Sequence, residues 1–517
     1  MVSAAGVLWA ISLPTFSFAG GAFLAPAILL LGCSHEQGWR RFLKGWWCGM
    51  VCSLISLDWL LNIPFPKGAI AGWIALSVYA GIFPGVWCVL NGTAGEGGNW
   101  GQRQRFALMC ALSWVGLELA RSHLLGGFPV NLLGVSQYRN VPLIQISSIT
   151  GVYGVSFLVV WFSASLLNVL RALKQERAYR GLMGEIAIQL LVMLGTSIWG
   201  MGRVRNAPAP DRFVKLSMVQ PAIPQELIFE PGEGTNRFEQ LLRLSEKGLE
   251  SDSQCLIWPE AAMPPWSSEN YKALTNFIAL KKVSMVLGCD DAEPETIEGK
   301  TQYKYYNAAF LFNEKGQHAG SYRKKRLVIF GEYVPMLKWL SFLRYLTPIE
   351  SSYEAGEKSV SFPIPGSDAR CSVLICFEDF FPHGGPEAVF PETDFLLNLT
   401  NDGWFKEGMM QWQHAINGLF RAVENGVPLV RSTNNGLTCW IDAYGRIREV
   451  FKDERGSVYG VGVFNVDLPI VSSVKRAETF YHRHGDWFGM GAALITALAT
   501  VRLWRDSRKA NRESSEN

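Results

Sequence analysis

The chain has 517 residues, of which 49% are hydrophobic and 18% are charged, and its formal net charge is +3. Soluble proteins carry about 25% charged residues, so this chain is poor in charge for its length. The small, scattered net charge argues against nucleic-acid binding. Ten cysteines without a CxxC pair indicate neither a dense disulfide framework nor a zinc or redox motif. Because the charge deficit lies mostly in residues 1–201, the sequence predicts a membrane region followed by a large soluble one.

The apolar stretches of the chain predict its membrane helices. A membrane-spanning helix needs about 20 mostly apolar residues, and six stretches meet this requirement: 44–63, 68–90, 105–124, 150–170, 183–202 and 485–503. Pro14 and the pair Gly20-Gly21 interrupt the apolar first 33 residues, so we expect a hairpin of two short helices there, 2–14 and 17–33. One alternative is a single first span, and another is a signal peptide, although its basic start is missing. With the hairpin, the chain has about eight spans.

Basic residues are distributed unevenly between the loops that join these stretches. With eight spans, one set of loops and the tail carry most of them: Arg40, Arg41, Lys44, Arg103, Arg105, Arg171, Lys174, Arg177, Arg180, Arg502, Arg505, Arg508, Lys509 and Arg512. The opposite loops carry little beyond Lys67 and Arg139. Since cytoplasmic loops are enriched in Lys and Arg, we expect the large soluble region to lie on the outer side of the membrane.

The predicted organisation follows from these spans and loops. Residues 1–202 hold transmembrane helices 1–7, 203–483 form an extracytoplasmic domain, 484–503 form a C-terminal transmembrane helix, and 504–517 form a basic cytoplasmic tail. Within the soluble region, short apolar runs predict strands at 214–219, 255–258, 283–288, 308–313, 372–376, 395–399, 428–433 and 438–443. Helical patterns at 237–248, 271–281 and 411–425 alternate with them. Strands that alternate with helices predict a layered α/β domain.

A glutamate follows one predicted strand directly. Glu260 comes after Trp258-Pro259, and proline cannot continue a central strand. Sites in α/β proteins form where strands end, and a carboxylate placed there among Trp258, Met263 and Trp266 should be desolvated. Its pKa should then be raised, which suits a general base. The alternative is an ordinary turn glutamate on the surface or a helix cap.

A cysteine and a lysine stand at two other strand ends. Cys376 ends the buried-looking strand 372–376, where the following backbone N–H groups can support an oxyanion. Most cysteines on apolar strands are simply small buried residues, and we expect that of Cys371, Cys289, Cys255 and Cys439. The basic run 323–326 leads into an apolar stretch with an isolated Glu332, so one of its lysines is a candidate for a buried cation. A buried ammonium favours a thiolate and stabilises an oxyanion, whereas the usual basic run is a solvated face.

A Glu, a Lys and a Cys in this order, each at a strand end, resemble the catalytic triad of the nitrilase superfamily. With the predicted spans around such a domain, the chain resembles the bacterial apolipoprotein N-acyltransferase family over nearly its whole length. The motifs that carry the resemblance are Gly126-Gly127-Phe128-Pro129, Trp258-Pro259-Glu260, residues 324–334, Cys376-Phe377-Glu378, Asn401-Asp402-Gly403-Trp404-Phe405 and 431–436. This resemblance implies a nitrilase-like α-β-β-α sandwich beside a polytopic helical membrane domain.

The resemblance also implies roles for single residues. Glu260 becomes the proton acceptor, Lys324 the residue that stabilises the oxyanion, and Cys376 the nucleophile, with Lys325 as the alternative lysine. Glu332 and Glu378 match supporting acids of the family.

Three aromatic residues match substrate-binding positions of the family: Trp404, Phe377 and Phe229. Phe377 stands where tyrosine is frequent and Phe229 where tryptophan is frequent, so a hydrogen bond is lost at each position. The apolar residues Val334, Met336, Leu337, Trp339 and Leu340 are candidates for a lipid-facing rim, with ordinary core as the alternative.

The family implies transfer of an acyl chain from the sn-1 position of a phospholipid, with phosphatidylethanolamine the expected donor. The chain passes through a cysteine thioester to the N-terminal amine of S-diacylglyceryl-cysteine in apolipoproteins. This is the last step of lipoprotein maturation and takes place at the periplasmic face of the bacterial inner membrane, without cofactor, metal or nucleic acid. Two other classes stay open: a membrane-tethered amidase that acts on a soluble amide, and a non-enzymatic binding or transport protein. Few ionisable residues, mainly Asp58 and Glu118, lie inside the predicted spans, which argues against transport.

Overall fold

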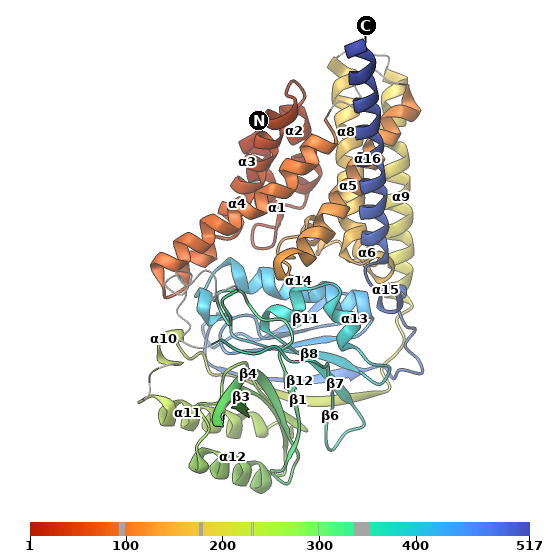
Figure 1. Cartoon of the computed structure of the whole chain (residues 1–517). Coiled ribbons are helices and arrows are strands. Elements are labelled where there is room, and N and C mark those ends of the chain that lie inside the picture. Colours follow the sequence, from red (N-terminus) through yellow and green to blue (C-terminus); the bar gives the residue numbers. More distant parts are fainter. Residues whose placement is uncertain are drawn as a thin grey trace. The chain divides into compact units, whose positions relative to one another are not determined.

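The computed structural model describes residues 1–92, 99–174, 179–228, 230, 232–297, 299–335 and 352–516. The chain divides into two compact units. Met1–Asp58, Trp73–Arg205 and His484–Asn517 form the first, which we call the helical unit, and Trp59–Gly72 and Asn206–Arg483 form the second, which we call the sheet unit. Figure 1 shows their helices and strands in the colours of the sequence.

Each apolar stretch predicted from the sequence overlaps a helix of the described chain. These helices are α1 (Val2–Ser12), α2 (Gly20–Gly32), α3 (Gly38–Ser56), α4 (Pro66–Leu90), α5 (Trp100–His123), α8 (Val152–Lys174), α9 (Tyr179–Arg205) and α16 (Trp487–Glu516). The first two match the helices expected at 2–14 and 17–33, so the apolar start of the chain is helical on both sides of its interruption.

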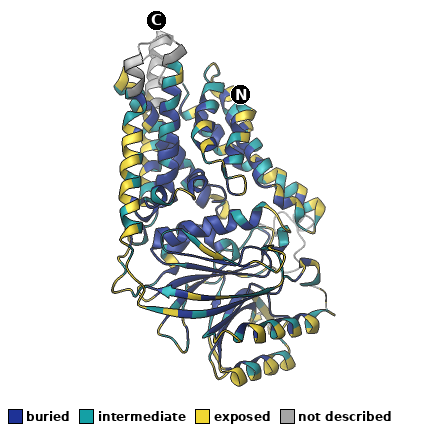
Figure 2. Cartoon of the chain, turned by 180° about the vertical axis from the view of Figure 1, so that it is seen from behind, coloured by how far each residue is buried: buried dark blue, intermediate teal, exposed yellow. Residues whose placement is uncertain are grey.

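Among the described residues, three helices are both long and apolar enough to cross a membrane: Pro66–Leu90, Val152–Arg171 and Gly184–Arg205. Shorter apolar helices cover Val2–Ser12, Gly20–Gly32, Val141–Thr150 and Trp487–Arg502. Helix α9 carries exposed residues along its length (Figure 2), among them Leu191, Leu194 and Ile198, and α4 also exposes part of its surface, whereas most of α8 is buried. Such apolar surface is unfavourable in water and is consistent with lipid contact, while the number of spans stays a prediction.

The predicted span 44–63 is wrong at its C-terminal end. Helix α3 ends at Ser56, and Asp58–Asn62 forms a 3₁₀ turn, most of which belongs to the sheet unit. Trp59 is buried there, donating from Nε1 to Gln413 Oε1 at 3.1 Å, and its ring meets Phe405 edge-on with centroids 4.7 Å apart. Hydropathy cannot distinguish a residue buried against protein from one buried in lipid, which explains the error.

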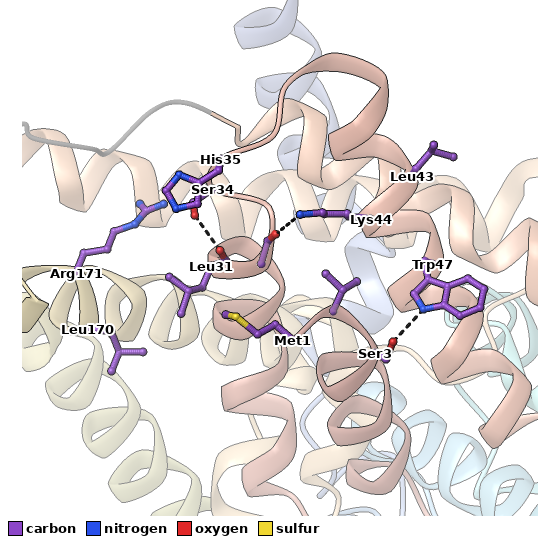
Figure 3. Close-up of a pocket in the computed structure, with 12 residues that line it drawn as sticks. Met1, Ser3, Leu31, Ser34, His35, Leu43, Lys44, Trp47, Leu170 and Arg171 are labelled. Atoms are coloured by element: carbon purple, nitrogen blue, oxygen red, sulfur yellow. Dashed lines mark hydrogen bonds between the residues drawn. The ribbon is translucent and has the colours of Figure 1, made fainter.

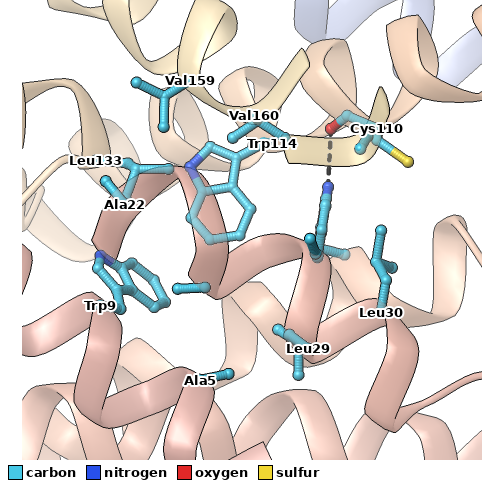
Figure 4. Close-up of a cluster of buried hydrophobic side chains, with 14 of the residues drawn as sticks. Ala5, Trp9, Ala22, Leu29, Leu30, Cys110, Trp114, Leu133, Val159 and Val160 are labelled. Atoms are coloured by element: carbon cyan, nitrogen blue, oxygen red, sulfur yellow. Dashed lines mark hydrogen bonds between the residues drawn. The ribbon is translucent and has the colours of Figure 1, made fainter. Parts of the chain in front are cut away.

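The core of the helical unit is built around three tryptophans (Figure 4). Trp114 packs against Trp9 and Trp87, with ring centroids 5.0 and 4.9 Å away. The Trp87 indole donates to the Cys110 carbonyl oxygen at 2.8 Å, so its one polar group is satisfied inside the core. Glu118 accepts from the Trp114 indole at 3.0 Å and from the Leu133 N–H at 2.7 Å. These bonds give the buried carboxyl a structural role between two segments of the unit.

Several helix ends of the helical unit frame a cavity of about 860 Å³ (Figure 3). Met1, Ser34, Lys44 and Arg171 all line it, and Lys44 pairs with Glu36 at 2.9 Å. The N-terminus, the loop after α2 and the end of α8 therefore lie at one end of this unit. The sequence predicts the same grouping, because Lys44 and Arg171 belong to loops that share a side in the charge pattern.

Within the described residues, the sheet unit contains two six-stranded sheets. The first has the order β12-β1-β2-β3-β4-β5 and consists of Gly462–Ile470, Arg212–Gln220, Cys255–Trp258, Ser284–Ile297, Lys300–Phe312 and His318–Arg323. The second has the order β11-β10-β9-β8-β7-β6 and consists of Ile447–Val450, Cys439–Ile441, Leu429–Thr433, Phe395–Thr400, Arg370–Ile375 and Ser361–Pro363. Strands β1, β2 and β3 run parallel in the first sheet, and β7, β8 and β9 run parallel in the second.

The two sheets face each other through one apolar core, to which both contribute, for example Leu216 and Ile257 from the first and Val373 and Leu397 from the second. Helices α11 (Gly234–Leu249) and α12 (Ser268–Lys281) cover the outer face of the first sheet through a separate core. Helix α14 (Met409–Asn425) covers the second sheet (Figure 1). The layers are therefore helix, sheet, sheet and helix, as the resemblance to the nitrilase superfamily implies.

Candidate active site

The predicted site residues stand at one edge of the paired sheets. Glu260 follows β2, and Cys376 follows β7. Lys324 follows β5, which is antiparallel to β4 as β4 is to β3, so β5 points the same way as the parallel strands. Parallel strands present their carboxyl ends together, which is where α/β sites form. The fold thus brings together Glu260 and Cys376, which are 116 positions apart in the sequence.

Backbone geometry positions Glu260. The residue after it, Ala261, has a φ of 50°, so the chain turns sharply out of the strand. Gly288 on the neighbouring strand β3 lies against this turn, and a Cβ there would stand 2.4 Å from the Pro259 oxygen and 2.6 Å from the Glu260 Cα. Only glycine leaves room for so close an approach. Glu260 is buried as a result, with 7% of its surface exposed.

The Lys324 ammonium lies between two buried carboxylates. Its Nζ is 2.8 Å from Glu332 Oε1 and 3.5 Å from Glu260 Oε1. Asn307 on β4 donates from Nδ2 to both acids at 2.8 Å, and its carbonyl accepts from the Lys324 N–H at 2.8 Å. Lys324 is 1% exposed. The Lys324 ammonium is therefore held at the centre of the site by the Glu260 and Glu332 carboxylates.

Lys325, the alternative lysine, points elsewhere. Its Nζ contacts Glu387 Oε2 at 2.9 Å and Ser359 Oγ at 3.2 Å, and Arg326 contacts the same glutamate. These three side chains form partly exposed ion pairs, as the basic residues of a surface segment usually do. The structure therefore places Lys324, and not Lys325, beside Glu260.

Cys376 adopts a strained backbone at the end of β7. Its φ is 50°, in the left-handed region that costs a non-glycine residue about 1–2 kcal/mol. A short 3₁₀ turn, Cys376–Phe380, begins there, and the first N–H groups of such a turn have no partner within it. The half-buried thiol lies close enough to the Glu260 carboxyl for each to shift the pKa of the other. The thiol, the carboxyl and the ammonium therefore form one group.

Burial and local charges set the protonation of this group. Burial raises the pKa of Glu260, the Glu332 charge raises it further, and Lys324, Asn307 and Cys376 oppose the rise. Burial and the Glu260 charge also raise the pKa of the Cys376 thiol, with Lys324 and the Thr400 hydroxyl acting against them. Burial alone would lower the pKa of Lys324, but Glu332, Glu260 and Cys376 outweigh it, so the pKa is raised. At rest, the Cys376 thiol is therefore neutral, the Glu260 carboxyl is more basic than usual, and the Lys324 ammonium keeps its charge.

Glu378 joins the segment that carries Cys376 to the segment that carries Lys324. Its carboxylate accepts from the Ile375 N–H at 2.8 Å and from the Lys325 N–H at 2.8 Å. The Tyr322 hydroxyl donates to both of its oxygens, at 2.9 and 2.7 Å. Glu378 is 3% exposed. Its contacts are those of a structural brace, while Glu332 touches the lysine ammonium directly.

A cluster of buried charges, which the sequence did not reveal, lies behind the cysteine. His414 on α14 stands between Asp379 Oδ1, 2.9 Å from its Nε2, and Asp402 Oδ1, 2.7 Å from its Nδ1. Arg431 on β9 pairs with both aspartates. All four side chains are fully buried, and we call them the charge cluster. Burial and Arg431 lower the pKa of His414, but Asp379 and Asp402 more than compensate and raise it to about 9.

The charge cluster also holds the backbone of the cysteine. His414 Nε2 donates to the Cys376 carbonyl oxygen at 3.1 Å, and Asn398 Nδ2 donates to the same oxygen at 3.1 Å. Because a peptide group is planar and trans, fixing this oxygen also fixes the direction of the Phe377 N–H, which points the opposite way. The cluster therefore sets the orientation of the first donor after the cysteine.

The predicted substrate-binding aromatics have different outcomes. Trp404 is half-buried and lines a cavity of about 320 Å³ in the sheet unit. The Phe377 ring packs on Phe380 and Phe381, with centroids 4.9 and 5.2 Å away, so it stabilises its own turn. Phe229 lies outside the described residues, as do Met336, Leu337, Trp339 and Leu340 of the predicted rim. Val334 is described and is buried.

Comparisons with known proteins bear on both units. Residues 5–165 match the family model for the Apolipoprotein N-acyltransferase N-terminal domain, and residues 215–462 match that for Carbon-nitrogen hydrolase. The Apolipoprotein N-acyltransferase of Geobacter metallireducens is 31% identical over 96% of this chain and 94% of its own. The protein of the same name from Rickettsia prowazekii is 30% identical over 79% of this chain and 78% of its own. Among solved structures, the NitN amidase from Neterenkonia sp. AN1 covers 50% of this chain and 93% of its own, at 17% identity and a TM-score of 0.36, a likeness too weak to carry an argument.

Proposed function

Because the chain belongs to the apolipoprotein N-acyltransferase family, we propose that it moves an acyl chain from a phospholipid to a lipoprotein through a thioester on Cys376. Membership makes it a membrane-associated acyltransferase of the nitrilase superfamily that acts in lipoprotein maturation. The proposal adds the donor, the covalent intermediate and the residues. The observation that carries it is the grouping of the Cys376 thiol, the Glu260 carboxyl and the Lys324 ammonium at one sheet edge.

In the first half-reaction, Glu260 takes the proton of Cys376 as the sulfur attacks the sn-1 ester carbonyl of phosphatidylethanolamine. The carbon–sulfur bond forms, and the carbonyl oxygen of the ester becomes an oxyanion. The Lys324 ammonium, which keeps its proton because of the acids around it, and the Phe377 N–H stabilise that charge. When the carbon–oxygen bond breaks, Glu260 returns the proton to the leaving oxygen, and a lysophospholipid departs.

In the second half-reaction, the α-amine of S-diacylglyceryl-cysteine attacks the thioester carbonyl. Glu260 removes a proton from the attacking nitrogen, the carbon–sulfur bond breaks, and the thiolate takes that proton back. Protons and charge balance over the two steps, so no cofactor is needed. One carboxyl serves both steps because its raised pKa brings it closer to the pH at which it works.

The remaining residues act through these three. Glu332 lies 2.8 Å from the Lys324 ammonium and keeps it charged. Glu378 holds the segment that carries Lys324 against the segment that carries Cys376. Trp404 stands at a cavity beside the site, where a substrate group can be accommodated. We place the sheet unit on the periplasmic side of the inner membrane, because both substrates are lipids of the outer leaflet. The charge asymmetry of the loops supports that orientation.

A direct assay tests the proposal. The purified full-length protein, given phosphatidylethanolamine and a diacylated lipopeptide, should produce lipopeptide heavier by one acyl chain. Cys376→Ala should abolish this product, whereas the matched control Cys371→Ala, in the fully buried part of the same strand, should retain it. If soluble amides were hydrolysed and the lipopeptide stayed unchanged, the amidase alternative would replace the acyltransferase.

A further inference from the structure

The cavity beside Trp404 lies at the same sheet edge as the nucleophile. It has a volume of about 320 Å³, at the small end of ligand pockets. Asn435 lines it two residues after β9 ends, and Gly403 lines it three residues after β8 ends. The last residue of β8, Thr400, lies beside the Cys376 thiol and favours its ionised form. The cavity is therefore separated from the nucleophile by only a few residues of one strand end.

A network of amide hydrogen bonds holds the cavity open. Asn401 donates to Gln225 Oε1 at 2.8 Å, and Asn434 donates to Asn401 Oδ1 at 3.0 Å. Asn434 also exchanges hydrogen bonds with the backbone of Ile223, at 3.1 and 2.9 Å. These bonds tie the loop after β1 in the first sheet to the loops after β8 and β9 in the second. The walls are therefore preorganised and do not depend on a ligand.

The cavity offers groups of both charges and a neutral donor. Asn435, which lines the cavity, is 5% exposed. Glu226 and Lys406, both exposed, supply one carboxylate and one ammonium to the same walls. Burial and the charges of Asp402, Glu226 and Glu407 raise the pKa of the lining residue Tyr459 to about 12, so its phenol stays a neutral donor.

We propose that this cavity binds the phosphoethanolamine headgroup of the acyl donor, which makes it the site of headgroup selection. The inference rests on the proposed function, to which it adds the recognition residues. The ammonium of the headgroup fits the Glu226 carboxylate, because the carboxylate is an anionic acceptor at the cavity wall. The phosphate fits the Lys406 ammonium and the Tyr459 hydroxyl, because both are donors. A pocket with one acid and one base suits a zwitterion better than a headgroup of a single charge.

The lipopeptide α-amine is the competing occupant, since it is also a primary ammonium. It carries no phosphate, so it would leave Lys406 without a counter-charge. The order of the reaction separates the two occupants. A donor pocket affects formation of the acyl-enzyme, whereas an acceptor pocket affects only its consumption.

The experiment measures the two half-reactions of the full-length protein separately. Vesicles of phosphatidylethanolamine or of phosphatidylglycerol with the same acyl chains are supplied without acceptor, and the growth of acyl-Cys376 is followed by intact-protein mass. Glu226→Gln should slow acylation from phosphatidylethanolamine about tenfold, as expected when one charge-assisted hydrogen bond is removed. Acylation from phosphatidylglycerol should stay the same. Glu226→Lys should reverse the headgroup preference.

Glu250→Gln removes a matched exposed acid that comes just before β2, at the opposite edge of the sheet, and should change neither rate. Equal loss with both donors in Glu226→Gln would refute headgroup selection. Normal acylation with a raised lipopeptide KM would assign the cavity to the acceptor and also refute it. If no variant and no donor gave acyl-Cys376 while the lipopeptide was still acylated, the proposed thioester would fail instead, which distinguishes the two claims.

Discussion

Protonation of His414 should stabilise the sheet unit in a defined pH window. The imidazole is fully buried, and its pKa is about 9 in the folded chain, compared with about 6.5 in an unfolded one. The folded state therefore holds an extra proton between these values, so stability is fully present below about pH 6.5 and is lost as the pH rises through about 9. At about 1.4 kcal/mol for each pKa unit, the proton contributes roughly 3 kcal/mol.

His414→Gln removes this contribution while keeping a donor for the Cys376 carbonyl. Thermal unfolding in detergent should show the native protein losing roughly 6–12 °C of Tm from pH 6.5 to pH 9.5, at about 2–4 °C for each kcal/mol. His414→Gln should start lower and show a flatter profile across that window. The control His318→Gln changes an exposed histidine outside the charge cluster and should keep the native slope. A native Tm that does not fall, or the same slope in His414→Gln, would refute the assignment of the proton.

Three further predictions concern the nucleophile, the turn that carries the base, and the topology. Cys376→Ala should cost only about 1 kcal/mol of stability, in the range of a small truncation, yet remove all turnover; residual turnover would place the nucleophile elsewhere. Gly288→Ala should displace the Glu260 turn, because its Cβ would stand 2.4 Å from a backbone oxygen, and the overpacking should cost about 1–3 kcal/mol of stability. The kcat should fall with little change in the lipopeptide KM, and an unchanged kcat would contradict the positioning of Glu260 by this turn. A cysteine introduced at Lys315 should react with an impermeant maleimide once the outer membrane is permeabilised, and one at Lys509 only after the inner membrane is broken; the reverse pattern would contradict the proposed orientation.

The strand ends of the site could be predicted because their signals are local. The proline after Trp258 marks the end of β2, and a polar residue after an apolar run marks the end of β7. The carboxyl ends of parallel strands are where α/β sites form, so both ends could be predicted to belong to the site. The choice between Lys324 and Lys325 needed the structure. Both lysines come directly after β5, and only the fold shows which of the two side chains meets Glu260.

The charge cluster could not be predicted because its members come from four segments and look ordinary in each. Asp379 follows Glu378 at the start of a turn, and His414 sits in an amphipathic helix where a polar residue is unremarkable. Arg431 lies on a buried strand, and a charged residue at such a position requires a partner. Asp402 and Arg431 also belong to motifs of the family resemblance, but nothing in the motifs joins them to Asp379 and His414. The end of the predicted span 44–63 failed for a related reason, since Trp59 packs against the sheet unit and not against lipid.

The measurement that tests the central claim most directly is the mass of the protein after incubation with phosphatidylethanolamine and no acceptor. Two-step transfer through a nucleophile requires a covalent intermediate, so one acyl chain should be added to the peptide that contains Cys376. Neutral hydroxylamine should remove it, as it does a thioester, and Glu260→Gln should prevent its formation because the thiol loses its proton acceptor. An adduct that resists hydroxylamine, or no adduct under conditions that support lipopeptide acylation, would contradict the thioester and point to direct transfer between two bound lipids.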